Sequence, residues 1–189
     1  MGQLAEYAQY LAGPHTVFVE TGCFLGEGLS TAQAYFTDLY ACDISGKYVK
    51  HCKKLFPQAI LRHQDSLTFL LDICPGITGQ AVFWLDAHYP TQYDNSIIES
   101  DSNKFPLYEE LKVIRQRKPG YAQDIIICDD LRVIQSEDNP VRGDIGSRNL
   151  QPRHLMFDKT FAAYLAVFRD THEYQLVGLD GLLLLPRHP

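Results

Sequence analysis

Apolar residues along the chain alternate between two periods. Short runs rich in Val, Ile and Leu alternate with longer segments in which apolar residues recur every three or four positions. The short runs predict buried strands and the longer segments predict amphipathic helices. The expected strands are residues 16–20, 39–43, 59–63, 81–86, 124–128, 174–177 and 182–185. The expected helices are residues 4–11, 28–36, 47–55, 66–73, 107–116 and 157–168.

Strands that alternate with helices in this way favour a mostly parallel sheet covered on both faces. The last two expected strands are separated only by residues 178–181, Gly-Leu-Asp-Gly, which cannot hold a crossover helix. These two strands should therefore form an antiparallel hairpin. The expected fold class is α/β, a Rossmann-like, doubly wound, seven-stranded sheet that is mostly parallel and ends in a C-terminal antiparallel hairpin. With no repeat or linker, residues 1–189 should form a single domain.

Composition narrows the classes of partner. The 189 residues are 46% hydrophobic and 21% charged, as in an ordinary globular domain. A net charge of −6 disfavours nucleic-acid binding, and no apolar run approaches the roughly 20 residues that cross a membrane. The start of the sequence does not resemble a secretory signal, and the five scattered cysteines suggest reduced thiols. We therefore expect a cytoplasmic protein that acts on a small molecule.

A glycine-rich turn follows the first expected strand. Residues 21–28 read Thr-Gly-Cys-Phe-Leu-Gly-Glu-Gly and lead into a helix, which is the arrangement of a nucleotide-type binding turn. Gly22, Gly26 and Gly28 do not have the GxGxxG spacing of a dinucleotide site, and Glu20 beside them would repel a pyrophosphate. A cationic ligand fits this turn better. The alternative is that the glycines serve only close packing.

Two further polar positions follow the next two strands. Asp43 ends the second expected strand, where α/β nucleotide folds place an acid on the ribose hydroxyls. Asp65 and Ser66 lie just past the third strand. Together with the glycine turn, these residues predict one binding site along the carboxyl edge of the sheet.

The segment from Glu20 to Gly28 resembles the E/D-x-G-x-x-x-G motif of class I S-adenosylmethionine-dependent methyltransferases, and Asp43 resembles their ribose-binding acid. The resemblance implies S-adenosylmethionine (SAM) as cofactor. It places Glu20 and Gly22 at the methionine end, with Gly26 and Gly28 in the same turn. It also places Asp43 at the ribose, and Asp65 with Ser66 near the adenine.

Three carboxylates follow the fourth and fifth expected strands. Asp86 comes after the fourth strand, and Asp129 with Asp130 after the fifth, so all three should converge at one edge of the sheet. Like charges this close are costly unless a cation intervenes, and Mg²⁺ or another divalent ion prefers such oxygen ligands. The alternative is that Asp129 or Asp130 caps the turn that follows the strand.

This acid set is similar to that of the metal-dependent O-methyltransferases of catechols and sugars. The similarity implies O-methylation of a hydroxylated small molecule, such as a sugar or polyphenol, with Asp86 and His88 as catalytic residues and His88 as base. The Asp-x-His spacing departs from the sugar-modifying enzymes, and His88 could instead satisfy a loop backbone. A non-catalytic cofactor-binding module and, less favoured, a nicotinamide-dependent oxidoreductase are the rival interpretations.

Two long polar segments, residues 89–105 and 135–154, should leave the same edge as binding loops or lids. The second carries several basic residues in an otherwise acidic protein, so the acceptor could be anionic, although a solvated loop is an equal alternative. Its basic residues are Arg142, Arg148, Arg153 and His154. Since the chain has no long N-terminal extension to roof the pocket, we expect an open site or a roof supplied by a second subunit in a homo-oligomer.

Overall fold

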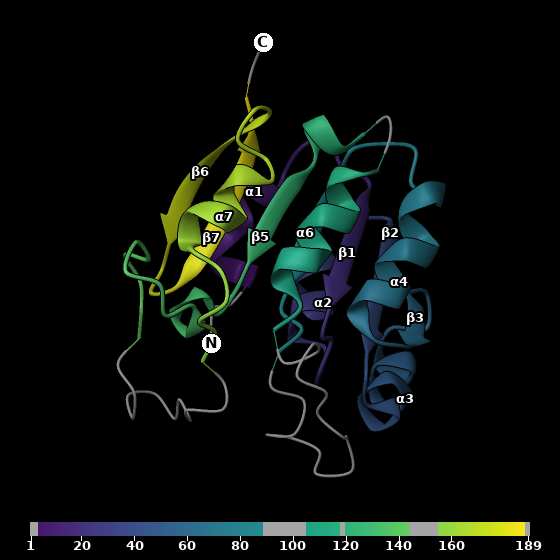
Figure 1. Cartoon of the computed structure of the whole chain (residues 1–189). Helices are drawn as coiled ribbons and strands as arrows, with labels where there is room; N and C mark the ends of the chain where they lie inside the picture. Colours follow the sequence, from purple (N-terminus) through teal and green to yellow (C-terminus); the bar gives the residue numbers. More distant parts are fainter. Residues whose placement is uncertain (1–3, 89–104, 118–119, 144–154, 188–189) are drawn as a thin grey trace.

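A computed structural model of the chain describes residues 4–88, 105–117, 120–143 and 155–187. Within these residues, seven strands form one sheet in the order β3-β2-β1-β4-β5-β7-β6 (Figure 1). Strands β1 to β5 run parallel, and β7 is antiparallel to both β5 and β6. The predicted fold class and its C-terminal hairpin are therefore confirmed. The strands are β1 (Val17–Thr21), β2 (Asp38–Asp43), β3 (Ile60–His63), β4 (Ala81–Leu85), β5 (Ile125–Cys128), β6 (His172–Val177) and β7 (Gly181–Pro186).

Helices cover both faces of this sheet, so the molecule has three layers (Figure 1). Alternate residues of β1 point to opposite layers, and both Phe18 and Val19 are fully buried. One layer contains α4 (Ser66–Ile73), α6 (Leu107–Arg115) and α7 (Phe161–Ala166). The other contains the 3₁₀ helix η1 (Leu4–Tyr7), α1 (Ala8–Leu11), α2 (Glu27–Ala32) and α3 (Gly46–Leu55). Short 3₁₀ helices complete the described elements: η2 (Cys74–Gly76), η4 (Tyr121–Gln123) and η5 (Leu131–Val133).

The predicted helices occur in the right places, but three have different limits. The segment 4–11 is divided into η1 and α1, and α2 ends at Ala32 rather than at residue 36. The last helix begins at Phe161, not at residue 157, because the Thr160 side chain accepts a hydrogen bond from the Ala163 backbone and caps the helix there. None of the described helices is long and apolar enough to cross a membrane.

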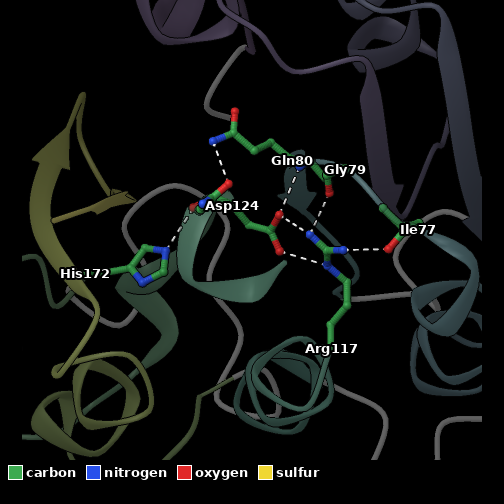
Figure 2. A network of polar contacts seen from close by, with 8 residues as sticks. Ile77, Gly79, Gln80, Arg117, Asp124 and His172 are labelled. Carbon is green, nitrogen blue, oxygen red and sulfur yellow. Dashed lines mark hydrogen bonds and ion pairs between the residues drawn. The ribbon is translucent and has the colours of Figure 1, made fainter. Parts of the chain in front are cut away.

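A buried ion pair fixes α6 to the amino ends of β4 and β5 (Figure 2). Arg117 donates to both Asp124 carboxylate oxygens, with Nε at 2.9 Å from Oδ2, and to the carbonyl oxygens of Ile77 and Gly79. Asp124 Oδ1 also accepts from the Ala81 backbone at 2.9 Å. These bonds satisfy the polar groups at the edge of the sheet opposite the acid set.

Candidate functional site

The glycine turn after β1 has the backbone conformation that only glycine adopts without strain. Gly22 and Gly26 have φ values of +82° and +85°. A Cβ atom on Gly22 would lie 2.4 Å from the Asp86 carbonyl oxygen. The backbone N–H groups of Gly22 and Cys23 both donate to the Cys42 carbonyl oxygen at 3.0 Å. The turn is thus held between the ends of β2 and β4. Gly22 is required both for its positive φ and for the close approach of the Asp86 backbone.

Glu20 places a buried carboxyl group beside this turn. It is 2% exposed, and its Oε2 atom has no hydrogen-bond partner among the described residues. Burial, followed by the charge of Asp86, raises the pKa of Glu20 well above its ordinary value. A Cβ atom on Gly28 would lie 2.0 Å from Glu20 Oε1, so the first turn of α2 leaves just enough room for this carboxyl group.

Asp43 links the end of β2 to the glycine turn. Its Oδ2 accepts from the Phe24 backbone N–H at 2.9 Å, and its Oδ1 accepts from the Ser45 N–H at 2.7 Å. These bonds orient the carboxylate, which remains on the surface of the cavity that the turn borders. Phe24, with a φ of +43°, is in the left-handed region, which shows how tightly the turn is constrained.

Asp65 and Ser66 lie at the start of α4, as their positions in the sequence predict. Asp65 is the N-cap of this helix, and its Oδ1 accepts from the Thr68 backbone at 3.0 Å. Ser66 is buried. Asp65 therefore has a structural role that the sequence reasoning did not assign to it, although both residues also line the cavity.

A cavity of about 400 Å³ connects these positions. All seven residues predicted for the cofactor except Gly26 line it, and Asp86 and His88 line it too. Sequence reasoning missed Tyr48 and Trp84 in the lining. Tyr48 lies in the first turn of the helix after Asp43, and Trp84 immediately precedes the last residue of β4. Both lie close to the carboxyl end of a strand, and that position could have predicted them as lining residues.

The cavity is also partly roofed by the N-terminal segment. Leu4 and Ala5 of η1 line it, and Leu4 is 3% exposed. Tyr7 packs edge-on against Trp84 at a ring-centroid distance of 5.5 Å. A short N-terminal segment therefore covers part of a site that the sequence predicted to be open or roofed by a second subunit.

The acid set is arranged around the imidazole of His88. Its Nδ1 lies 3.1 Å from Asp86 Oδ1, and its Nε2 contacts Asp130 Oδ2. Burial of the ring opposes protonation, but the charges of Asp130 and Asp86 outweigh it and raise the pKa of His88 to about 9. This raised pKa favours a protonated His88 at neutral pH. Burial outweighs the charge of His88 and raises the pKa of Asp86 well above its ordinary value, so Asp130, whose pKa is lowered, is the carboxylate that balances the imidazolium.

Asp130 also contacts a second cation. Arg132 forms ion pairs with Asp130 and with Asp180, which belongs to the turn between β6 and β7. Asp130 has a φ of +59°, and the backbone of Leu131 donates to the Asp180 carbonyl oxygen at 3.0 Å. The sequence did not predict Asp180 as a site residue. The order of the strands in the sheet, with β7 next to β5, brings the β6–β7 turn to this edge, and the spacing of the strands along the chain does not show this order.

The three predicted metal ligands fall into two overlapping groups. Potential ligand atoms of Asp86, His88 and Asp130 lie within 4.8 Å of one another, and so do those of Asp129, Asp130 and Asp180. Burial and the neighbouring Asp130 raise the pKa of Asp129, whereas His88 and Arg132 outweigh burial and lower that of Asp130. Asp130 is therefore the shared, ionised centre of the set, and its charge is balanced by protein cations.

Glu110 is a further buried carboxyl group that the sequence did not single out. It lies in the first turn of α6, is 1% exposed, and its Oε1 has no hydrogen-bond partner among the described residues. Burial raises its pKa to about 7, against the lowering effect of the Ser66 and Thr21 hydroxyl groups. A Glu one turn inside an amphipathic helix is usually solvated, so the sequence pattern gave no signal.

The two loops expected to carry substrate contacts are described only in part. Residues 89–104 and 144–154, with Arg148, Arg153 and His154, lie outside the described residues. Residues 135–143 are fixed by hydrogen bonds: Gln135 donates to the Met156 carbonyl oxygen at 2.8 Å, and the buried Asn139 side chain donates to two backbone carbonyl groups. Arg142 is exposed.

No protein-family model matches this sequence, and no curated protein matches it. Solved structures do share its fold. CalS10 of Micromonospora echinaspora, a SAM-bound amino pentose methyltransferase, aligns with a TM-score of 0.60 over 97% of this chain and 89% of its own, at 12% identity. DesVI of Streptomyces venezuelae gives 0.59 over 98% and 91%, at 13% identity.

The 23S rRNA methyltransferase ErmE also aligns, with a TM-score of 0.55 over 97% of this chain and 67% of its own, at 11% identity. The chain therefore has the fold of SAM-dependent methyltransferases. A sugar and an RNA are both substrates among these proteins, so the fold does not decide the acceptor.

Proposed function

We propose that this chain is a SAM-dependent methyltransferase that binds its cofactor in the cavity beside the glycine turn. The observation that carries the proposal is Glu20, a buried carboxyl group on the cavity whose Oε2 has no partner among the described residues. An uncompensated buried carboxylate is costly, and a ligand ammonium group would satisfy it. SAM, when bound, supplies both that ammonium group and an electrophilic methyl carbon.

The chain's own residues would then divide the work along the cavity. Glu20 would bind the amino group, Asp43 would accept from the ribose hydroxyls, and Asp65 with Ser66 would border the adenine. Asp86 and His88 border the same cavity. Because its raised pKa keeps His88 protonated at neutral pH, His88 could act as the base only after giving up that proton, whereas Asp86, whose pKa burial raises, could take the proton of an acceptor hydroxyl directly. This arrangement supports O-methylation of a small hydroxylated acceptor, and a net charge of −6 supports a small molecule over nucleic acid.

Calorimetric titration with SAM and with S-adenosylhomocysteine (SAH) tests the cofactor. We expect both to bind, and Asp43→Asn to weaken binding by about 1–3 kcal/mol, because a hydrogen-bonded carboxylate is lost. Asp38→Asn, at the exposed start of the same strand, is the matched control and should bind normally. Binding of NAD in place of both ligands would instead support an oxidoreductase.

We further propose that a divalent cation, Mg²⁺ foremost, assists the transfer from Asp86, Asp129 and Asp130. The two groups of ligand atoms support it. However, Mg²⁺ takes oxygen ligands, and Asp130 already contacts His88 and Arg132. The residues therefore fit the ion only if His88 moves away from Asp130, and His88 in its present place is the competing source of positive charge.

Chelation separates these two accounts. If the metal is required, chelator should abolish turnover while SAH binding remains, because the glycine turn and Asp43 are on other strands. Asp129→Asn should then behave like chelation. If His88 and Arg132 supply the charge, turnover should resist chelator, and Arg132→Met should lower it instead. A non-catalytic binding module would bind SAH and transfer no methyl group to any acceptor in a screen of sugars and polyphenols.

A further inference from the structure

The helix α3 and the edge strand β3 lie at one side of the molecule and carry a dense group of basic residues (Figure 1). Residues 44–64 contain five of the 17 Lys and Arg residues of the chain and no Asp or Glu. The five are Lys47, Lys50, Lys53, Lys54 and Arg62. Because the whole chain has a formal net charge of −6, its other residues together carry −11. The charge of the protein is therefore strongly asymmetric.

The exposed side of α3 is basic along its whole length except at its last residue, Leu55. Its other exposed residues, which we call the basic face, are Lys47, Lys50, His51, Lys53 and Lys54. The opposite side of the helix is formed by Tyr48, Val49 and Cys52, which are buried. The packing of α3 on the sheet therefore leaves the basic face directed toward solvent.

The lysines of the basic face have no carboxylate partners within the described part of the chain. There, lysine forms ion pairs only at Lys112 and Lys159, which lie in other segments. Lys50 and Lys54 are four positions apart on one helix, and like charges at this spacing destabilise the helix. An acidic surface placed against the basic face would relieve this repulsion.

We propose that the basic face is a docking surface for an acidic helix of a partner protein. Lys47, Lys50 and Lys54 follow the spacing i, i+3, i+7, so they lie along one line of the α3 surface. An acidic helix whose carboxylates recur every three or four residues has the same spacing and can pair with all three when it lies along α3. None of these lysines lines the cavity, so this surface goes beyond the proposed cofactor site.

The chemistry of α3 favours an acidic protein over nucleic acid or a membrane. The aromatic residues within 46–63, Tyr48 and Phe56, are both buried, so this segment offers no exposed ring on which a base could stack. A helix that binds a membrane buries an apolar face in the lipid, but the apolar face of α3 is packed in the core, and of its exposed residues only Leu55 is apolar.

Two synthetic helical peptides of identical composition test the match of spacing. In the striped peptide, glutamates recur every three or four residues on one side, and in the scattered peptide they are distributed around the helix. Fluorescence anisotropy measures the binding of each labelled peptide to the full chain at low salt. We expect the striped peptide to bind more tightly, by on the order of tenfold, and added salt to weaken it. Equal affinity for the two peptides, or no binding of the striped one, would overturn the proposal.

Charge reversal tests the position of the surface. Lys50→Glu combined with Lys54→Glu should weaken binding of the striped peptide by on the order of tenfold or more. The matched control is Lys112→Glu combined with Arg169→Glu, which changes the net charge by the same amount at exposed positions outside α3 and should bind like wild type. A striped peptide with lysines in place of its glutamates should bind the first variant and not the wild type. Equal weakening in the two variants would overturn the proposal, because overall charge would then explain the binding.

Other polyanions and the cofactor complete the test. Vesicles of phosphatidylserine and phosphatidylcholine, and a short single-stranded RNA, are titrated into wild type at the same salt. Tighter binding of either than of the striped peptide would overturn the assignment to an acidic helix. Both variants should bind SAH with wild-type affinity, which shows that they are folded. If the wild type binds the striped peptide but not SAH, the proposed function fails while the docking surface stands.

Discussion

Gly28 and Glu20 are fitted to each other at the scale of single residues. Because a Cβ atom on Gly28 would lie 2.0 Å from Glu20 Oε1, Gly28→Ala must displace the carboxyl group. We expect a loss of stability of about 1–3 kcal/mol from overpacking, and loss of measurable SAH binding. Thermal unfolding and calorimetry would measure the two effects.

Gly79→Ala is the matched control for that substitution. A Cβ atom on Gly79 would meet nothing within 4 Å, so both stability and SAH affinity should be preserved. SAH binding by Gly28→Ala at wild-type affinity would mean that Glu20 does not face the bound cofactor.

Single residues also show which parts of the site could be predicted from the sequence. The carboxylates at Glu20, Asp43 and Asp86 could be placed because each ends or follows a parallel strand, and such ends meet at one edge. The side chains that pair with the carboxylates at this edge could not be predicted in the same way, as Asp130 shows. Contact between Asp130 and Arg132 is local, but the reach of Arg132 to Asp180 depends on β7 pairing with β5.

At the scale of elements, the position of α6 depends on the buried Arg117–Asp124 pair. Arg117→Met would leave the Asp124 carboxylate buried without its cation, and we expect a loss of about 3–5 kcal/mol in the free energy of unfolding. SAH affinity should change little, since this pair lies at the opposite edge of the sheet. Urea denaturation and calorimetry would measure the two quantities.

Lys112→Met, within α6 itself, is the control. Lys112 pairs with Glu109 at 2.7 Å, but both side chains are about half exposed, so its loss should lower the free energy of unfolding far less than the loss of Arg117 does. Similar losses for the two variants would show that burial of the Arg117 pair is not what stabilises α6.

The start of β6 should make stability depend on pH. His172 Nε2 donates to the Asp124 carbonyl oxygen at 2.9 Å, and burial lowers the pKa of the ring, with Arg115 acting in the same direction. The unfolded chain therefore takes up a proton before the folded one does. The stabilisation from neutral His172 is complete above the unfolded pKa of about 6.5 and is lost as the pH falls below it.

Urea denaturation at several values between about pH 7 and pH 5 would measure this dependence. We expect the free energy of unfolding to fall on acidification, and His172→Gln to fall less steeply than wild type. His15, whose pKa burial also lowers, acts in the same direction and remains in the variant, so the difference between the two proteins isolates His172. Parallel curves would contradict the prediction.

Element boundaries were harder to predict than element types. Periodicity located α4 correctly, but it extended the last helix back to residue 157, where apolar residues continue the pattern without continuing the helix. The start at Phe161 is set by Thr160 and by Asp138, which accepts from the Phe161 and Ala162 backbone from a distant part of the chain. Hydrophobic spacing contains no information about such contacts.

At the scale of the whole molecule, the two hydrophobic layers share one sheet. Strands β1, β4 and β5 each contribute alternate residues to both layers, so neither layer can form without the other. We expect residues 1–189 to unfold as a single domain in one transition. Far-UV circular dichroism and the fluorescence of Trp84, the single tryptophan, should give coincident denaturation curves. Separate midpoints would indicate two units.

The place of β7 also constrains the order in which the protein can be completed during synthesis. Although it follows every other strand in the sequence, β7 lies inside the sheet between β5 and β6. Until β7 has left the ribosome, the edge of β5 that β7 will cover is unpaired. The sequence of β5, Ile-Ile-Ile-Cys, is entirely apolar, so this edge is prone to pair with other chains. A nascent chain arrested before Gly181 should therefore depend on chaperones. In the complete chain, the short connection of residues 178–181 lets β7 fold back from β6 and pair with β5.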